Sequence, residues 1–109
     1  MPLTFDPVEA RYADDCDGEP GVTFRAHAAG SEPRELVSCR VQKAALDVLL
    51  DEASGDGPIE GESALEAAAE RFRPIILAVA DAKFDRGDWV LDGIRKVVVV
   101  RMGDVLTAG

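Results

Sequence analysis

Apolar and polar residues alternate over residues 22–28, and a second segment with the pattern of a strand covers residues 35–41. A period of two residues is typical of a strand with one buried face. Between the two runs, residues 30–33 have the Gly, Ser and Pro composition of a turn. The pattern therefore predicts a β-hairpin with strands at 22–28 and 35–41. A short strand at 3–5 and an irregular acidic segment at 6–21 precede it.

A second hairpin is predicted near the C-terminus. Residues 89–91 form a short apolar run, Asp92 and Gly93 suit a two-residue type I′ turn, and residues 95–101 form the return strand. Four consecutive valines at 97–100 leave this return strand without a polar face. Such a strand is buried on both faces, either inside a sheet or at a contact between two chains.

Two helices are predicted between the hairpins. An apolar stretch without breakers suits a short helix over about residues 42–52. Apolar residues then recur at steps of three and four, which favours a long amphipathic helix over residues 63–86. Pro74 interrupts this helix, because proline removes one helical hydrogen bond and clashes with the preceding turn. Since the apolar stripe keeps its phase across Pro74, we expect a kink there rather than two helices.

These elements favour a single α+β domain over residues 1–109. We expect a two-layer architecture, in which a short helix and a long kinked helix pack on one face of an antiparallel sheet of about five strands. Packing against helices is needed because an isolated hairpin is only marginally stable. The residues expected in the core are Phe24, Leu46, Leu49, Leu65, Phe72, Ile76, Val79, Val97 and Val99.

The chain has 109 residues and a net charge of −9, which is unevenly distributed. Residues 1–70 hold 16 acidic and 5 basic side chains, whereas residues 71–109 hold 5 acidic and 7 basic ones. A pI near 4.4 argues against binding to nucleic-acid phosphates, which needs clustered Lys and Arg. The longest apolar run is too short to span a membrane and no secretory signal is visible, so we expect a cytoplasmic location.

The sequence carries one histidine, two cysteines and no catalytic, cofactor or metal motif. Cys39 lies in a predicted strand and is expected to be buried, whereas the acidic neighbours of Cys16 disfavour a thiolate. His27 alternates onto the strand side opposite Phe24, where we expect it to be exposed or to face a partner. We therefore predict no catalytic residue, no cofactor and no metal ion.

Arg73, Lys83 and Trp89 are candidate contacts with a partner. The alternative for Arg73 and Lys83 is a role in the fold, because Arg73 can pair with Glu70 and Lys83 can lay its stem along the apolar stripe. The alternative for Trp89 is packing at the rim of the sheet rather than anchoring an interface.

Val98 and Val100 are the remaining candidate contacts. Helices on one side of the sheet can cover only one pair of the four valines, and monomers rarely leave large apolar patches open. We therefore expect a homodimer through the valine-rich strand or the sheet face to which it belongs. In the competing account the N-terminal segment, with Tyr12, folds back over that face.

Taken together, these segments resemble the domain of unknown function 1488 (Shew3726-like) family of small bacterial proteins. The resemblance covers nearly the whole chain, although Gln42 and Pro74 depart from the pattern of the family. It implies an α+β fold and no established activity. The segments that carry the resemblance are residues 3–5, 22–24, 41–46 and 73–84, the Asp92-Gly93 turn, the valine-rich strand and residues 104–106.

Three functions are compatible with these observations. The leading hypothesis is a non-enzymatic cytoplasmic interaction or regulatory module that binds an unknown protein partner. The second is an enzyme of unrecognised type, which needs a deep pocket with two titratable groups of perturbed pKa. The third, least favoured, is a nucleic-acid regulator. It needs Arg71, Arg73, Lys83, Arg86, Arg95, Lys96 and Arg101 to converge on one face.

Overall fold

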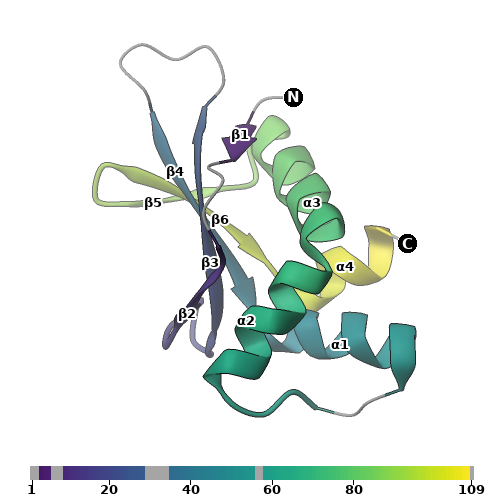
Figure 1. Ribbon diagram of the computed structural model, residues 1–109. Helices are drawn as coiled ribbons and strands as arrows, with labels where there is room; N and C mark the ends of the chain where they lie inside the picture. The colour runs from purple at the N-terminus through teal and green to yellow at the C-terminus, as the bar shows by residue number, and fades with distance from the viewer. Residues whose placement is uncertain (1–2, 6–8, 29–34, 56–57, 109) are drawn as a thin grey trace.

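The computed structural model describes residues 3–5, 9–28, 35–55 and 58–108. This part of the chain has an α+β fold, with a mixed sheet of six strands and four helices (Figure 1). The strands are β1 (Leu3–Phe5), β2 (Arg11–Ala13), β3 (Gly21–Ala28), β4 (Leu36–Gln42), β5 (Val90–Asp92) and β6 (Arg95–Val100). The helices are α1 (Lys43–Ser54), α2 (Glu62–Arg71), α3 (Arg73–Asp85) and α4 (Met102–Ala108).

The strand order in the sheet is β1-β3-β4-β6-β5, and β2 also pairs with β3. The predicted hairpins β3–β4 and β5–β6 are both present. The expectation of a purely antiparallel sheet is wrong at one pair, because β4 and β6 run parallel with Cys39 opposite Val98. Three helices separate β4 from the second hairpin, and a connection of that length allows the chain to return in the same direction.

Strand β2 lies in the segment that was expected to be irregular. Helix carboxylates accept hydrogen bonds from the backbone of β1, of β2 and of the residue before β2, at N···O distances between 2.7 and 3.0 Å. The N–H groups donate as follows: Leu3 to Asp81, Ala10 to Glu70 and Tyr12 to Glu66. These bonds satisfy donors that would otherwise lie free at the edge of a sheet.

The turn between β5 and β6 comes one residue later than predicted. Asp92 is the last residue of β5 and pairs with Arg95, so Gly93 and Ile94 form the two-residue turn. Gly93 has a φ of 67°, whereas Ile94 is not among the described residues with positive φ. A type I′ turn needs positive φ at both positions, so that turn type was wrong.

The long helix expected over residues 63–86 is divided into α2 and α3 at Phe72, instead of kinking at Pro74. Phe72 has φ −100° and ψ 15°, which lies outside the helical region, although its N–H still donates to the carbonyl of Ala68 at 3.0 Å. Pro74 lies in the first turn of α3, where a missing N–H costs no intrahelical hydrogen bond. The proline therefore starts a new helix.

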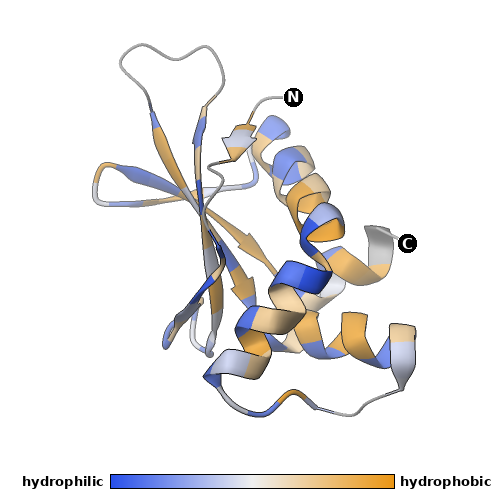
Figure 2. Cartoon of the chain, viewed as in Figure 1, coloured by the Kyte–Doolittle hydropathy of each residue, from blue (hydrophilic) through white to orange (hydrophobic). Residues whose placement is uncertain are grey.

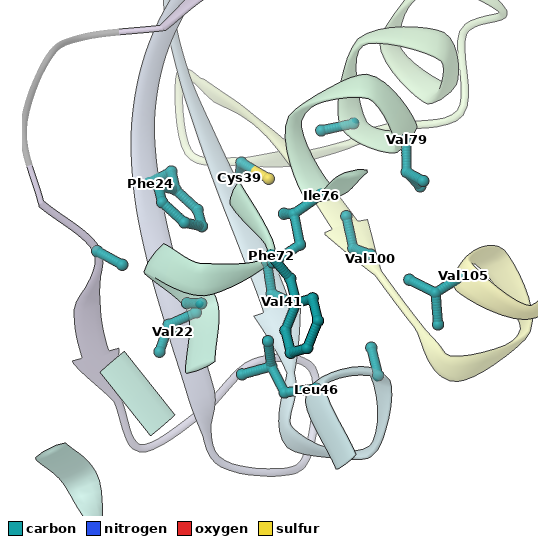
Figure 3. Packing of buried hydrophobic residues seen from close by; sticks show 14 of the residues in the cluster. Val22, Phe24, Cys39, Val41, Leu46, Phe72, Ile76, Val79, Val100 and Val105 are labelled. Carbon is teal, nitrogen blue, oxygen red and sulfur yellow. The ribbon is translucent and has the colours of Figure 1, made fainter. Parts of the chain in front are cut away.

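The hydrophobic core lies between the sheet and the helices, where apolar residues of both meet (Figure 2). Side chains from β3, β4, β6 and the helices point toward one another there, with Phe24, Ile76 and Phe72 among them (Figure 3). Every residue expected in the core is buried, with at most 8% of its surface exposed. Val97 and Val99 are buried but do not belong to this cluster, because they face the other side of the sheet.

Candidate functional site

The face of the sheet that points away from the core cluster is called the open face below. Strand register assigns its members, because residues opposite each other on neighbouring strands share a face. The central strands contribute Thr23, Arg25, His27, Leu36, Ser38, Arg40, Arg95, Val97 and Val99, and the flanking strands contribute Thr4, Arg11, Val90 and Asp92. The open face thus carries four arginines and one aspartate in a chain of net charge −9.

An ion pair crosses the open face above the valine-rich strand. Arg40 on β4 lies beside Val99, and its guanidinium reaches Asp92 on β5 at 3.0 Å. Val97 lies on β6 between these two strands, so the arginine stem and the ion pair pass over it. This coverage explains how Val97 is only 1% exposed without a helix on its side.

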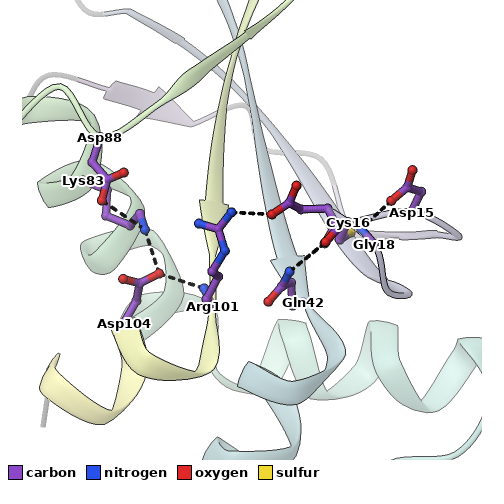
Figure 4. Close-up of polar contacts among 9 residues, drawn as sticks. Asp15, Cys16, Gly18, Gln42, Lys83, Asp88, Arg101 and Asp104 are labelled. Atoms are coloured by element: carbon purple, nitrogen blue, oxygen red, sulfur yellow. Dashed lines mark hydrogen bonds and ion pairs between the residues drawn. The ribbon is translucent and has the colours of Figure 1, made fainter.

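The loop between β2 and β3 contacts the ends of β4 and β6 (Figure 4). Arg101, directly after β6, pairs with Asp17 of this loop, and Gln42 Nε2 donates to the carbonyl oxygen of Cys16 at 3.0 Å. Directly after the loop, β3 approaches β4 closely at Gly21, where a Cβ atom would lie 1.9 Å from the carbonyl oxygen of Val41. The chain itself therefore covers this end of the valine-rich strand.

A hollow of about 270 Å³ lies at the opposite end of the open face. The side chains that line it from the open face are Thr23, Arg25, Leu36, Ser38 and Arg95. The remaining lining residues, Phe24, Ala26 and Val37, belong to the core cluster and form the floor. The described residues of the lining thus offer two guanidinium groups and two hydroxyls but no carboxylate.

Arg25 and Arg95 differ from most other cations of the molecule. Among the described residues, neither of them forms an ion pair, whereas seven other Lys and Arg side chains each contact a carboxylate. Both side chains are exposed. An arginine fork without a carboxylate partner is available to bind an external anion with two parallel hydrogen bonds.

Two of the predicted partner contacts are engaged within the fold. Arg73 pairs with Glu70 at 3.0 Å and lies over the ring of Phe24, 5.0 Å from its centroid. Lys83 is only 2% exposed, and its ammonium lies 2.7 Å from Asp104 and 3.2 Å from Asp88 (Figure 4). The pairing of Arg73 with Glu70 is the structural alternative stated for Arg73, whereas the two carboxylates that bind Lys83 were not predicted.

The ammonium of Lys83 perturbs one of its partners. Its hydrogen bond to Asp88 lowers the pKa of that carboxyl below the ordinary value of 3.8, and Arg86 acts in the same direction. Asp104 also accepts a hydrogen bond from the backbone N–H of Arg101 at 2.8 Å, so this cluster joins α3, α4 and the end of β6. The cluster therefore holds these three elements together and is not an exposed binding site.

The other predicted contacts also lie away from the hollow. Trp89 stacks on Phe84, with 6.3 Å between ring centroids, and the ammonium of Lys96 lies 4.3 Å from the Trp89 ring. Val98 and Val100 are 0% exposed and belong to the core cluster. The structure therefore does not bring the predicted contacts together on one surface.

Burial determines the chemistry of the two thiols. It raises the pKa of Cys16 to about 11 and the pKa of Cys39 to about 12, and both thiols are free. Neither cysteine lines any of the hollows found in the described chain. At neutral pH both are inert thiols.

A larger hollow of about 500 Å³ lies along α3 and touches α4 at Asp104. Its wall is mainly apolar, with Pro74, Ile75 and Ala78 among its residues. Its charged residues already have partners, because Arg86 pairs with Asp88 and Asp104 pairs with Lys83. This hollow therefore offers apolar contact but few free polar groups.

Comparison with known proteins identifies no relative, because no family model, curated protein or solved structure matches the chain significantly. The resemblance to the family named above stays a prediction. Within the described residues no helix has the length and apolarity to cross a membrane. The same residues contain no group of three His, Cys, Asp or Glu side chains placed to hold a metal ion.

Proposed function

We propose that this protein is a non-enzymatic interaction module of two layers, in which helices support the sheet from one side and the open face binds a partner protein. The observation that carries the proposal is that Arg25 and Arg95, beside a hollow on that face, form no ion pair with any other described residue. Exposed arginines next to apolar surface are enriched at protein interfaces. Leu36, which is 53% exposed, supplies the apolar surface.

The hollows support a binding role more than a catalytic one. An active site needs titratable groups with perturbed pKa values in a pocket. The groups with shifted pKa are Tyr12, Cys16, Cys39 and Asp88, and none of them lines a hollow found in the described chain.

The cations expected for a nucleic-acid regulator are dispersed. Lys83 is buried, and Arg73, Arg86, Lys96 and Arg101 are each paired with a carboxylate. Cations that are already paired contribute little to binding a phosphate backbone, which depends on several free positive charges. This arrangement favours a protein partner over a nucleic acid.

Self-association is the second candidate function. We place the contact between the two chains at β5 instead of the valine-rich strand. Val90, Leu91 and Ile94 are 59%, 64% and 102% exposed, and β5 is the last strand in the sheet order. An exposed apolar edge strand is a site for pairing with another chain. Sedimentation at micromolar concentration tests self-association. A wild-type mass near twice 11.6 kDa, together with a monomer mass for Leu91→Lys, would support it. A monomer mass for the wild type would reject it.

Comparative capture from a bacterial lysate tests the main proposal. The bait proteins are the wild type, the Arg25→Gln/Arg95→Gln double variant and Arg71→Gln. Arg71 is an exposed arginine on α2, so its variant changes charge without touching the open face. We expect a protein that the wild type and Arg71→Gln retain and the double variant loses. Identical sets of captured proteins for all three baits would contradict the proposal.

A further inference from the structure

We propose that the hollow between Arg25 and Arg95 binds the carboxylate side chain of an acidic, extended segment of the partner protein. This inference rests on the proposed function, since it assigns the chemistry of the partner to the same surface. Within the part of the chain that the structure describes, the lining has the groups that anion binding needs, namely two guanidinium groups and two hydroxyls, and it contains no carboxylate. Charge-assisted hydrogen bonds from arginine to a carboxylate are about twice as strong as neutral ones.

The strand register brings these donors to one place. Arg25 on β3 lies opposite Ser38 on β4, and Ser38 lies opposite Val97 on β6. Arg95 comes two residues before Val97 on the same face of β6. The Ser38 hydroxyl therefore lies on the strand between those that carry the two arginines. No hydrogen bond to another described group engages Ser38 Oγ or Thr23 Oγ1, so both remain available to an incoming carboxylate.

An apolar residue beside the two arginines allows the hollow to recognise more of the partner than one carboxylate. Leu36, on the rim of the hollow, leaves 53% of its surface exposed. In an extended segment, side chains on the same side are two residues apart. A glutamate in the hollow therefore places the side chain two positions away over the neighbouring surface, and an apolar residue there buries Leu36.

The charges favour an acidic peptide over a nucleic acid. A nucleic acid gains affinity from many phosphate contacts and from bases that stack on aromatic rings. The hollow presents two cations, and none of the described Phe, Tyr or Trp side chains belongs to the open face by register. The net charge of −9 repels a long polyanion, whereas a short acidic segment meets the local positive field.

Fluorescence anisotropy with two labelled peptides tests the inference. The first peptide alternates glutamate with leucine and serine, and the second replaces each glutamate by glutamine. Single-stranded oligothymidylate of the same charge is the third probe. The proteins are the wild type, Arg25→Gln, Arg95→Gln, the double variant and Arg71→Gln, each checked for an unchanged melting temperature.

We expect the wild type and Arg71→Gln to bind the glutamate peptide, each single variant to bind it about tenfold more weakly, and the glutamine peptide to bind poorly. Tighter binding of the oligonucleotide than of the glutamate peptide would overturn the inference, as would equal binding of this peptide to the wild type and the double variant. If the double variant loses a captured protein partner but binds the peptide as the wild type does, the acidic-segment inference fails and the proposed function stands. If the captured proteins are also unchanged, both fail.

Discussion

The guanidinium of Arg40 and the carboxylate of Asp92 lie 3.0 Å apart and bridge β4 to β5 over the strand between them. Val97 of that middle strand lies beneath the bridge, and it is buried although it faces away from the core cluster. The sequence predicts that Val98 and Val100 stay uncovered and infers a second chain to cover them. In the structure these two valines belong to the core cluster, and the valines of the open face are Val97 and Val99, which are buried within the chain itself.

Arg40→Ala should therefore destabilise the protein by uncovering Val97 as well as by breaking the ion pair. The exposed pair itself contributes little, whereas the lost stem uncovers apolar surface, so we expect a loss of about 1 kcal/mol in the free energy of unfolding. Urea unfolding measures it. Arg40→Met is the matched control, since it removes the charge but keeps the apolar stem. If Met and Ala destabilise the protein equally, the stem does not protect Val97.

Asp104→Ala should destabilise the protein, because it removes the ion pair between Asp104 and the buried ammonium of Lys83. Lys83 is 2% exposed, and removing one partner of a buried pair typically costs about 3–5 kcal/mol. Asp88 stays as a second partner of Lys83, so we expect the lower end of that range by urea unfolding. Adding Lys83→Met to this variant should restore part of the stability, because no buried charge is then left alone. If Asp104→Ala lowers the free energy of unfolding by less than about 1 kcal/mol, the Lys83–Asp104 ion pair does not hold these elements together.

The lowered pKa of Asp88 predicts a pH dependence with a defined sign. The folded-state pKa lies below 3.8, so the unfolded state binds the proton more readily. The stability that Asp88 contributes is present above its unfolded pKa and is lost as the pH falls through its folded pKa. Urea unfolding of the wild type and of Asp88→Asn should differ most near neutral pH and converge in strong acid. A difference that grows as the pH falls below 3.8 would show the opposite sign.

The sequence predicts the fold best where a local pattern decides the structure. The alternation of residues 22–28 and the apolar stripe on the helices locate β3 and the buried faces of α2 and α3 correctly. Such patterns do not predict the parallel pairing of β4 with β6, because this pairing depends on the path of the chain from one strand to the other. β2 depends on Glu66 and Glu70, which lie more than fifty residues away in sequence.

The candidate site was missed for a similar reason. The alternation in β3 already assigns Arg25 and His27 to the face opposite Phe24, which is a signal for the open face. Arg95 joins Arg25 only through the order of three strands, and no local pattern gives that order. The predicted contacts Arg73 and Lys83 are engaged by carboxylates, one of them from α4, a helix that was not predicted.

Phe72→Ala should be strongly destabilising. Phe72 is 8% exposed at the junction of α2 and α3 and belongs to the core cluster, so truncation leaves a cavity. We expect a loss of about 3–5 kcal/mol in the free energy of unfolding, measured as a lower urea midpoint. Ile75→Ala is the matched control, because Ile75 is 44% exposed on the same helix and should cost far less. Equal losses would place Phe72 outside the core.

The thiols should be unreactive in the folded protein. Burial raises the pKa of Cys16 to about 11 and the pKa of Cys39 to about 12, and both residues are 0% exposed. A disulfide reagent at pH 8 should label them only through transient opening of the fold, and therefore much more slowly than it labels free cysteine. The same protein in urea is the control and should react at once. Fast labelling of either folded thiol would contradict its burial.

Nuclear magnetic resonance is the most direct test of the open face as the binding surface. The glutamate peptide is titrated into isotope-labelled protein, and the backbone amide shifts of each strand and helix are followed. The account predicts saturable shifts in β3, β4 and β6 around Arg25, Ser38 and Arg95, which disappear in the Arg25→Gln/Arg95→Gln variant. Shifts confined to α3 and α4, or shifts on the open face that persist in the double variant, would contradict it.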